Sequence, residues 1–202
     1  MGRYQQAYDA YRGDLSSALL FNLEAYPEAL SLLRPFFPQG WATLPKDVAE
    51  DGGSYLATCA AGALQKIGAP TESLAALGAA LVSNLGREYW PAASTQLRNL
   101  SVTLRAQNRL AGEERGLLSV MSLAELTGDG EEIFMARLFR FDQLATIGKW
   151  DDARAAWDLL DPMGRNWSRA VYRPGTAEYW YAIFRFWQGD LTEAHLDHTP
   201  KS

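Results

Sequence analysis

The stretch that decides the fold is "IGKWDDARAAWDLLDP", residues 147–162. Its apolar residues fall at the spacing of one helix face: Trp150, Ala153, Trp157 and Leu160. Gly148, just before this helix, suits the left-handed backbone conformation in which helices commonly end. Asp161–Pro162 predicts the end of the new helix, because proline has no N–H donor and disfavours α geometry in the residue before it. The stretch therefore predicts a turn followed by a helix over 150–160.

Similar punctuation recurs along the chain. The other anchors, each followed two positions later by an apolar residue, are Gly13, Gly68, Asn108 and Gly189. With Gly148 included, the intervals between anchors are 55, 40, 40 and 41 residues. The residue five positions after an anchor is small in every unit except that of Asn108, where it is Glu113, and a leucine stands four positions before the middle three anchors. A fixed period of this length is the signature of helical-repeat architectures.

We therefore predict an all-α solenoid of about five helical hairpins in one domain, 1–202. The expected hairpins cover approximately 2–33, 53–85, 92–127, 131–160 and 176–198, and the turn at Gly13 divides the first into helices over 2–12 and 15–33. An insertion loop over 34–52 lengthens the first interval. Long loops are often functional, whereas the simpler interpretation is that the aromatic side chains of this loop cap the first hairpin.

The composition excludes several classes of protein. Hydrophobic residues make up 48% and charged residues 21% of the 202 residues, which is ordinary for a soluble globular protein. A net charge of −5 argues against general binding to nucleic acid or to an anionic membrane surface. No apolar stretch is long enough for a membrane span or for a signal peptide. The single cysteine, Cys59, cannot form an intramolecular disulfide, so we expect a cytoplasmic location.

Catalytic and metal-binding patterns are weak. The two histidines, His195 and His198, lie within the last eight residues, so we predict no metal site and no cofactor. Cys59 lies among alanines in "YLATCAAGAL" and is interpreted as a packing residue. Pairs of acidic residues stand at predicted helix starts, where negative charge favours the helix dipole. We therefore expect a protein that is not an enzyme.

The repeated pattern resembles the tetratricopeptide repeat, and "GKWDDARAAWDLLDP" is its best copy. The period of 40 is longer than usual for that family and is more similar to the helical repeats in sensor domains of bacterial regulators built like the maltose-regulon activator. The resemblance implies a right-handed superhelix whose first helices line a groove for a protein, a peptide or a small effector. It also implies that the chain is the sensor or interaction fragment of a larger bacterial regulatory or signalling protein.

Arginines on the predicted first helices are the candidate ligand contacts, because paired arginines bind carboxylates of an acidic peptide or an anionic effector. They are Arg98 and Arg105, Arg137 and Arg140, and Arg185, with Trp180 and Tyr181 as stacking groups. The alternative is that these arginines are solvated or form salt bridges with neighbouring helices.

The aromatic stretch "EYWYAIFRFW", residues 178–187, is apolar on every side. It leaves open a structural module that forms a homodimer through Phe184 and Trp187. The third hypothesis is an α/α-toroid enzyme with two carboxylates across a cleft.

Overall fold

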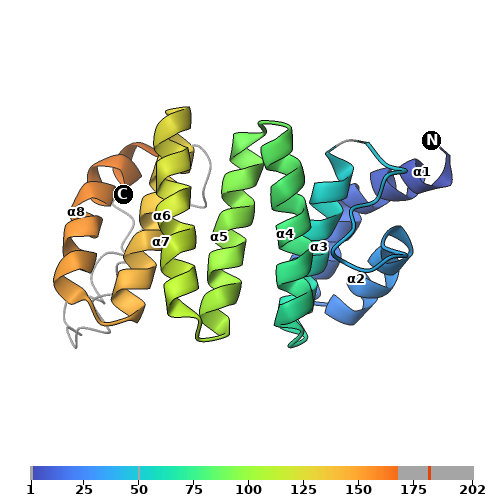
Figure 1. The fold of residues 1–202 in the computed structure, drawn as a ribbon, viewed down its shortest axis with the longest axis horizontal. Coiled ribbons are helices and arrows are strands. Elements are labelled where there is room, and N and C mark those ends of the chain that lie inside the picture. Colours follow the sequence, from blue (N-terminus) through green and yellow to red (C-terminus); the bar gives the residue numbers. More distant parts are fainter. Residues whose placement is uncertain (1, 50, 168–181, 183–202) are drawn as a thin grey trace, which may run out of the picture. The chain divides into compact units, whose positions relative to one another are not determined.

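The computed structural model describes residues 2–49, 51–167 and 182, and its regular secondary structure is helical throughout, with no strand among these residues (Figure 1). The predicted all-α fold class is confirmed. The chain divides into two compact units, Met1–Leu123 and Ala124–Ser202. Their boundary falls inside the helix α6, Leu110–Thr127. Among the described residues, none of the helices combines the length and the apolar character needed to cross a membrane.

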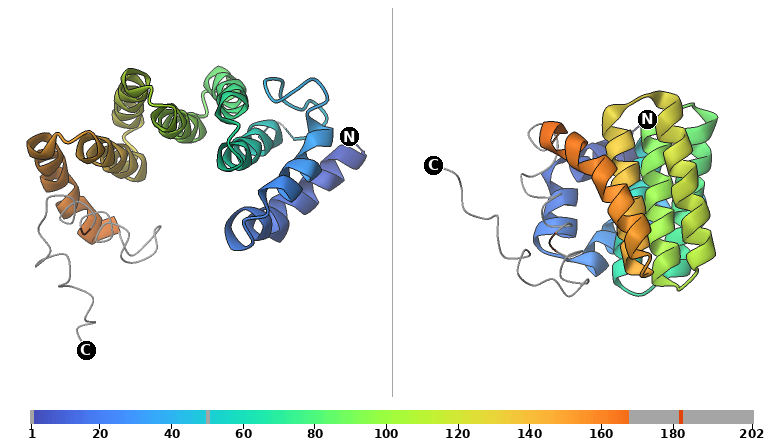
Figure 2. Two further views of the ribbon diagram at one scale, coloured as in Figure 1. Left: turned by 90° about the horizontal axis from the view of Figure 1, so that it is seen from below. Right: turned by 90° about the vertical axis from the view of Figure 1, so that its left-hand side faces the viewer.

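In the first unit, consecutive helices pack as neighbouring pairs. The elements are α1 (Arg3–Ala10), two π-helical segments (Tyr11–Leu15 and Ala18–Asn22), α2 (Tyr26–Leu33), a 3₁₀ turn (Arg34–Phe36), α3 (Gly52–Lys66), α4 (Pro70–Gly86), α5 (Trp90–Ala106) and most of α6. α4 packs against both α3 and α5. Figure 2 shows α3 and α5 in one layer with α4 in the other, so that α3 and α5 form a common first-helix side.

Left-handed turn residues set the repeat. Positive φ angles occur at five positions that are each 20 residues apart: Gly68, Glu88, Asn108, Gly128 and Gly148. The predicted conformation of Gly68, Asn108 and Gly148 is thereby confirmed. Glu88 and Gly128, midway between these anchors, make the same kind of turn. The structural period is therefore one helix and one turn of two or three residues in 20 residues, and two such periods give the 40-residue interval seen in the sequence.

Four of these turns end their helix in the same way. The N–H after the left-handed residue donates to the carbonyl five residues earlier, at 2.8 or 2.9 Å, in the pairs Ala69–Leu64, Tyr89–Asn84, Arg109–Leu104 and Lys149–Leu144. This bond satisfies a carbonyl that the helix end would leave without a partner. At the turn of Gly128 its own N–H donates to the Ala124 carbonyl instead, at 3.1 Å. There the Asp129 carboxylate accepts from the first N–H groups of the next helix, at Glu131 and Glu132.

Small residues after the turns let helices approach closely. Ser73, Ala93 and Ala153, each five positions after a left-handed residue, are fully buried. Glu113 occupies the same place in α6 and is 1% exposed, so a carboxylate is buried where the other units bury a small side chain.

The predicted break at Gly13 is a kink, because its backbone, with a φ of −66° and a ψ of −141°, is not helical and separates two helical stretches between Arg3 and Asn22. Gly13 is not left-handed, however, and the prediction that the second helix runs from 15 to 33 is wrong. The left-handed residue is Glu24, with a φ of 50°, and α2 begins after it at Tyr26 with a proline in its first turn. The helical stretch before the kink carries Tyr8 and Tyr11 into one buried cluster with α3.

The prediction that Asp161–Pro162 ends the last described helix is also wrong. α8 begins at Trp150 as expected but extends to Trp167. Proline removes one backbone donor and penalises only the adjacent turn, so a helix can continue past it. In the second unit α8 packs against α7 (Gly130–Thr146), and their core includes Phe141 and Trp157, whose ring centroids lie 5.2 Å apart. The hairpin predicted over 176–198 lies outside the described residues.

The insertion loop has a structured core. Phe37, Trp41 and Val48 are buried and join the cluster formed by α1, α2 and α3. The Arg34 guanidinium stacks over the Trp41 ring, 5.2 Å from its centroid. The aromatic side chains of the loop therefore do cap the first hairpin, and they also fix the loop in place.

Candidate functional site

The arginines predicted to line a groove make contacts within their own units. On α5, Arg98 is only 8% exposed and donates to the hydroxyls of Ser94 and Thr95 at 3.2 and 3.0 Å. Arg105 Nε lies 3.3 Å from the Glu113 carboxylate of α6. Arg98 and Arg105 share a face of α5, as the seven-residue spacing predicts. The Arg105–Glu113 contact agrees with the alternative in which these arginines form salt bridges with neighbouring helices.

The remaining predicted contacts divide into two groups. Arg137 and Arg140 both lie on α7 in the second unit, where the Arg140 guanidinium donates to the Gln143 side chain. The stacking, groove and dimer candidates Trp180, Tyr181, Phe184, Arg185 and Trp187 lie outside the described residues, as do His195 and His198.

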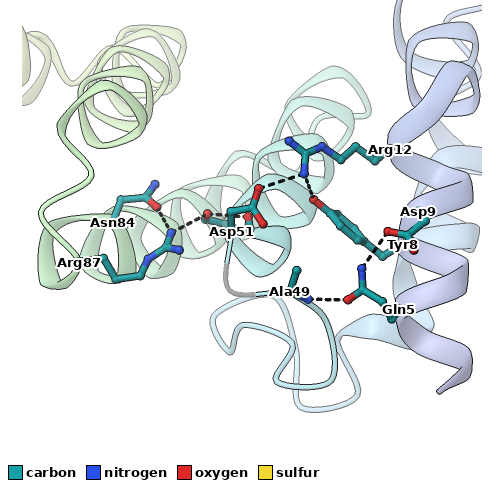
Figure 3. A network of polar contacts seen from close by, with 9 residues as sticks. Gln5, Tyr8, Asp9, Arg12, Ala49, Asp51, Asn84 and Arg87 are labelled. Carbon is teal, nitrogen blue, oxygen red and sulfur yellow. Dashed lines mark hydrogen bonds and ion pairs between the residues drawn. The ribbon is translucent and has the colours of Figure 1, made fainter. Parts of the chain in front are cut away.

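An exposed arginine that sequence reasoning missed is held at the junction of α1 and α3 (Figure 3). Arg12 Nη1 donates to the Tyr8 hydroxyl at 2.7 Å and lies 3.0 Å from an Asp51 carboxylate oxygen. Its guanidinium carbon is 5.7 Å from the ring centroids of both Tyr8 and Tyr55. The Tyr55 hydroxyl in turn bonds Ser16 Oγ at 2.8 Å. We call these five residues the Arg12 cluster.

The Arg12 cluster presents charge to solvent from a fixed position. The side chains of Arg12 and Asp51 are 52% and 46% exposed, whereas the Tyr8 ring beneath them is buried. Burial is also the main cause that raises the pKa of Tyr8, so its hydroxyl stays protonated at neutral pH. The one feature of the sequence that could have indicated the Arg12 cluster is the spacing of its residues. Arg12 and Asp51, like Ser16 and Tyr55, are 39 residues apart, close to the 40-residue repeat.

Two glycines at the start of α3 allow this junction to close. A Cβ on Gly52 would lie 3.0 Å from the Tyr8 ring and 3.2 Å from the Val48 side chain. A Cβ on Gly53 would lie 3.2 Å from the Pro45 carbonyl oxygen. The pair therefore lets α1 and the insertion loop approach the first turn of α3, and the Gln5 side chain secures the loop by accepting from Ala49 N–H at 2.6 Å.

A second polar network links α3, α4 and α5. Arg87 Nη2 donates to Asn84 Oδ1 at 2.6 Å and lies 3.4 Å from Ser54 Oγ (Figure 3). Gln96 of α5 donates to Thr58 Oγ1 of α3 at 2.7 Å. Three buried atoms in this network, Asn84 Nδ2, Arg87 Nε and Gln96 Oε1, have no hydrogen-bond partner among the described residues. Because these atoms are closed to solvent, the network serves helix packing rather than recognition.

Cys59 is not placed for nucleophilic chemistry. Burial raises the pKa of its thiol to about 11, and the hydroxyls of Tyr55 and Tyr11 oppose that shift only in part. A reactive cysteine needs the opposite shift, because the thiolate is the nucleophile. In the part of the chain that the structure describes, no group of three or more His, Cys, Asp or Glu residues is arranged to hold a metal ion.

A cavity of about 170 Å³ lies between α1 and the insertion loop. Its lining includes the rings of Tyr4 and Phe36 and three prolines of the loop, Pro35, Pro38 and Pro45. The Tyr4 and Phe36 rings meet edge to face, with centroids 5.8 Å apart. Arg12, Asp51 and this cavity therefore belong to one N-terminal region of the first unit, built from α1, the loop and the start of α3.

Comparison with known proteins adds no assignment: no family model, no curated protein and no solved structure matches this chain. The resemblance to tetratricopeptide repeats stays a prediction from the sequence.

Proposed function

We propose that this chain is a non-catalytic binding scaffold that recognises a protein or peptide segment through the Arg12 cluster and the neighbouring loop. The observation that carries the proposal is the position of Arg12. An arginine that is half exposed is held between two tyrosine rings and an aspartate, so binding a ligand requires little further ordering of its side chain. Tyrosine and arginine are also the residue types that dominate interface energetics.

The surrounding architecture supports this proposal. From α3 to α6, consecutive helices of 15 to 18 residues joined by three-residue turns make a scaffold whose faces are fixed by packing. The insertion loop departs from that uniformity, is anchored in the core by Phe37 and Trp41, and adds a cavity next to α1. A role as the interaction part of a larger regulatory or signalling protein is included in the proposal and rests on the repeat resemblance alone.

Selection from a displayed library of random peptides tests the proposal. We expect enriched peptides that bind the wild-type chain with micromolar or lower dissociation constants. Arg12→Ala should weaken their binding about fivefold or more, because truncating a hot-spot residue costs more than a rim contact. The matched control is Arg115→Ala, which removes an exposed arginine from α6 and should leave binding unchanged. Absence of enrichment, or equal binding by wild type and Arg12→Ala, would overturn the proposal.

A further inference from the structure

The cavity between α1 and the insertion loop has walls that are fixed before any ligand arrives. Phe36 and Val48 line it and are themselves part of the buried core. The loop is held at one end by the stack of Arg34 on Trp41 and at the other by the hydrogen bond from Ala49 N–H to Gln5. A preformed pocket of this kind avoids much of the ordering cost of binding.

The size of the cavity limits its occupant. About 170 Å³ is well below the roughly 300–1,000 Å³ typical of sites that enclose a whole metabolite or cofactor. Tyr4, one of the residues that line the cavity, is 45% exposed. One or two side chains of a longer segment fit these dimensions, with the rest of the segment lying along the loop.

The residues that line the cavity determine which side chains of a bound segment can occupy it. Two aromatic rings set edge to face and three proline rings offer flat, apolar, conformationally rigid surfaces. Grooves lined in this way recognise polyproline II segments, whose rings dock on aromatic walls. The backbone of such a segment makes no internal hydrogen bonds, so its carbonyls need donors. Along the loop, the N–H groups of Lys46, Asp47 and Val48 make no hydrogen bond with any described residue.

The geometry points to a proline-rich segment of a partner protein, in polyproline II conformation, as the occupant of this cavity. Its proline rings lie against Tyr4 and Phe36, and its carbonyls accept from the loop. Lys46 and Asp47, both exposed on the lining, place one charge of each sign at the mouth, so an acidic or a basic residue that flanks the prolines finds an opposite charge. This inference rests on the proposed function and names the partner class for it.

Titration with an oligoproline peptide of about eight residues, followed by fluorescence anisotropy of a label on the peptide, tests the inference. We expect saturable binding below about 1 mM, the weak range that such short segments occupy. A peptide of the same length made of glycine and serine should not bind, because it lacks rings and pays more entropy on ordering. Backbone amide NMR shifts should change on the residues that line the cavity.

Two variants keep the test independent of a folding defect. Tyr4→Ala removes one wall at an exposed position, and Thr43→Trp places a large ring at the lining; each should weaken oligoproline binding about fivefold or more. Phe21→Ala, at a residue 78% exposed outside this lining, is the control and should bind as wild type. No saturation at about 1 mM, or binding by Tyr4→Ala and Thr43→Trp that equals binding by wild type, overturns the inference. If peptides from the random library still bind through Arg12 in that case, the proposed function stands without it.

Discussion

Glu113 carries a carboxylate into the interior of the first unit, at a helix position where Ser73 and Ala93 are small. Its pairing with Arg105 at 3.3 Å offsets the cost of removing that charge from water. A buried pair of this kind adds little stability over an apolar substitute, yet losing one partner is expensive. The pair therefore explains why Arg105, a candidate ligand contact by sequence, is committed to packing.

We predict that Arg105→Met lowers the free energy of unfolding by about 3 kcal/mol, because it removes the salt-bridge partner of the buried Glu113 carboxylate. The double variant Arg105→Met/Glu113→Ala should recover most of this loss, since alanine matches the small residues at the equivalent positions. Urea unfolding of wild type and both variants checks this. The interpretation fails if Arg105→Met costs less than about 1 kcal/mol or if the second substitution adds to the damage.

Cys59 gives a prediction for pH. Because burial raises the pKa of its thiol to about 11, the reaction of the folded chain with a thiol reagent should be slow at pH 8 and should accelerate as the pH approaches 11. At pH 8 the thiolate is about one part in a thousand, compared with roughly a tenth for a cysteine with the unfolded pKa of 9. Labelling in urea should be about a hundredfold faster. Equal labelling rates in the folded and unfolded chain at pH 8 would contradict the burial of this thiol.

The same shift has a stability consequence whose sign is fixed. A folded-state pKa above the unfolded value of 9 means that the unfolded thiol ionises first as the pH rises. Stability is therefore full below pH 9 and is lost toward pH 11, by up to about 3 kcal/mol from this group. Cys59→Ala should show a smaller loss over that interval, with Tyr8, Tyr11 and Tyr55, whose pKa values burial also raises, contributing to the remainder.

At the scale of the element, two glycines allow turn conformation to be tested separately from helix propensity. Gly68 lies in the turn before α4, and Gly78 lies inside α4. Gly68 has a φ of 81°, a conformation that costs an alanine about 1–2 kcal/mol. Gly78 lies within α4 with nothing within 4 Å of a built Cβ, and alanine gains about 0.5–1 kcal/mol over glycine there. We predict that Gly68→Ala destabilises and Gly78→Ala stabilises the chain in urea unfolding. Shifts of the same sign would contradict the turn assignment.

Sequence spacing predicted the turns at Gly68, Asn108 and Gly148 because glycine and asparagine mark left-handed residues. The break between 85 and 92 was predicted, but its left-handed residue, Glu88, was not, because the residue type gives no such signal and only the 20-residue interval reveals it. At Gly13 the pattern located a real break in the helix, since ψ is −141° there, but the φ of −66° is not left-handed. The left-handed residue lies at Glu24, whose residue type gives no such signal.

The candidate site was less predictable than the fold. Arg98 and Arg105 share one face of α5, as their spacing indicated. Arg98 donates to hydroxyls one turn earlier on its own helix, whereas Arg105 pairs with Glu113 of α6, a contact whose register only the structure fixes. Arg12 escaped notice because its partner Asp51 lies at the far end of the insertion loop. The insertion loop itself was identified by its length and prolines, whereas its cavity depends on how Tyr4 meets Phe36.

At the scale of the whole molecule, the two compact units hold different structural features. The first unit, Met1–Leu123, holds the Arg12 cluster, the loop cavity and the first-helix side of α3 and α5. The second unit holds α7 and α8 with their own aromatic core. Binding assigned to the first unit should therefore act locally, since helical repeats contact mainly their neighbours in the chain.

Amide hydrogen exchange of the chain with and without a library-selected peptide tests the binding-scaffold claim most directly. The account predicts that, beyond any uniform slowing from stabilisation by the ligand, protection concentrates in residues 3–16 and 34–59, which include the Arg12 cluster and the loop. Extra protection confined to α4, α7 or α8, or no local protection from a peptide that binds, would contradict it.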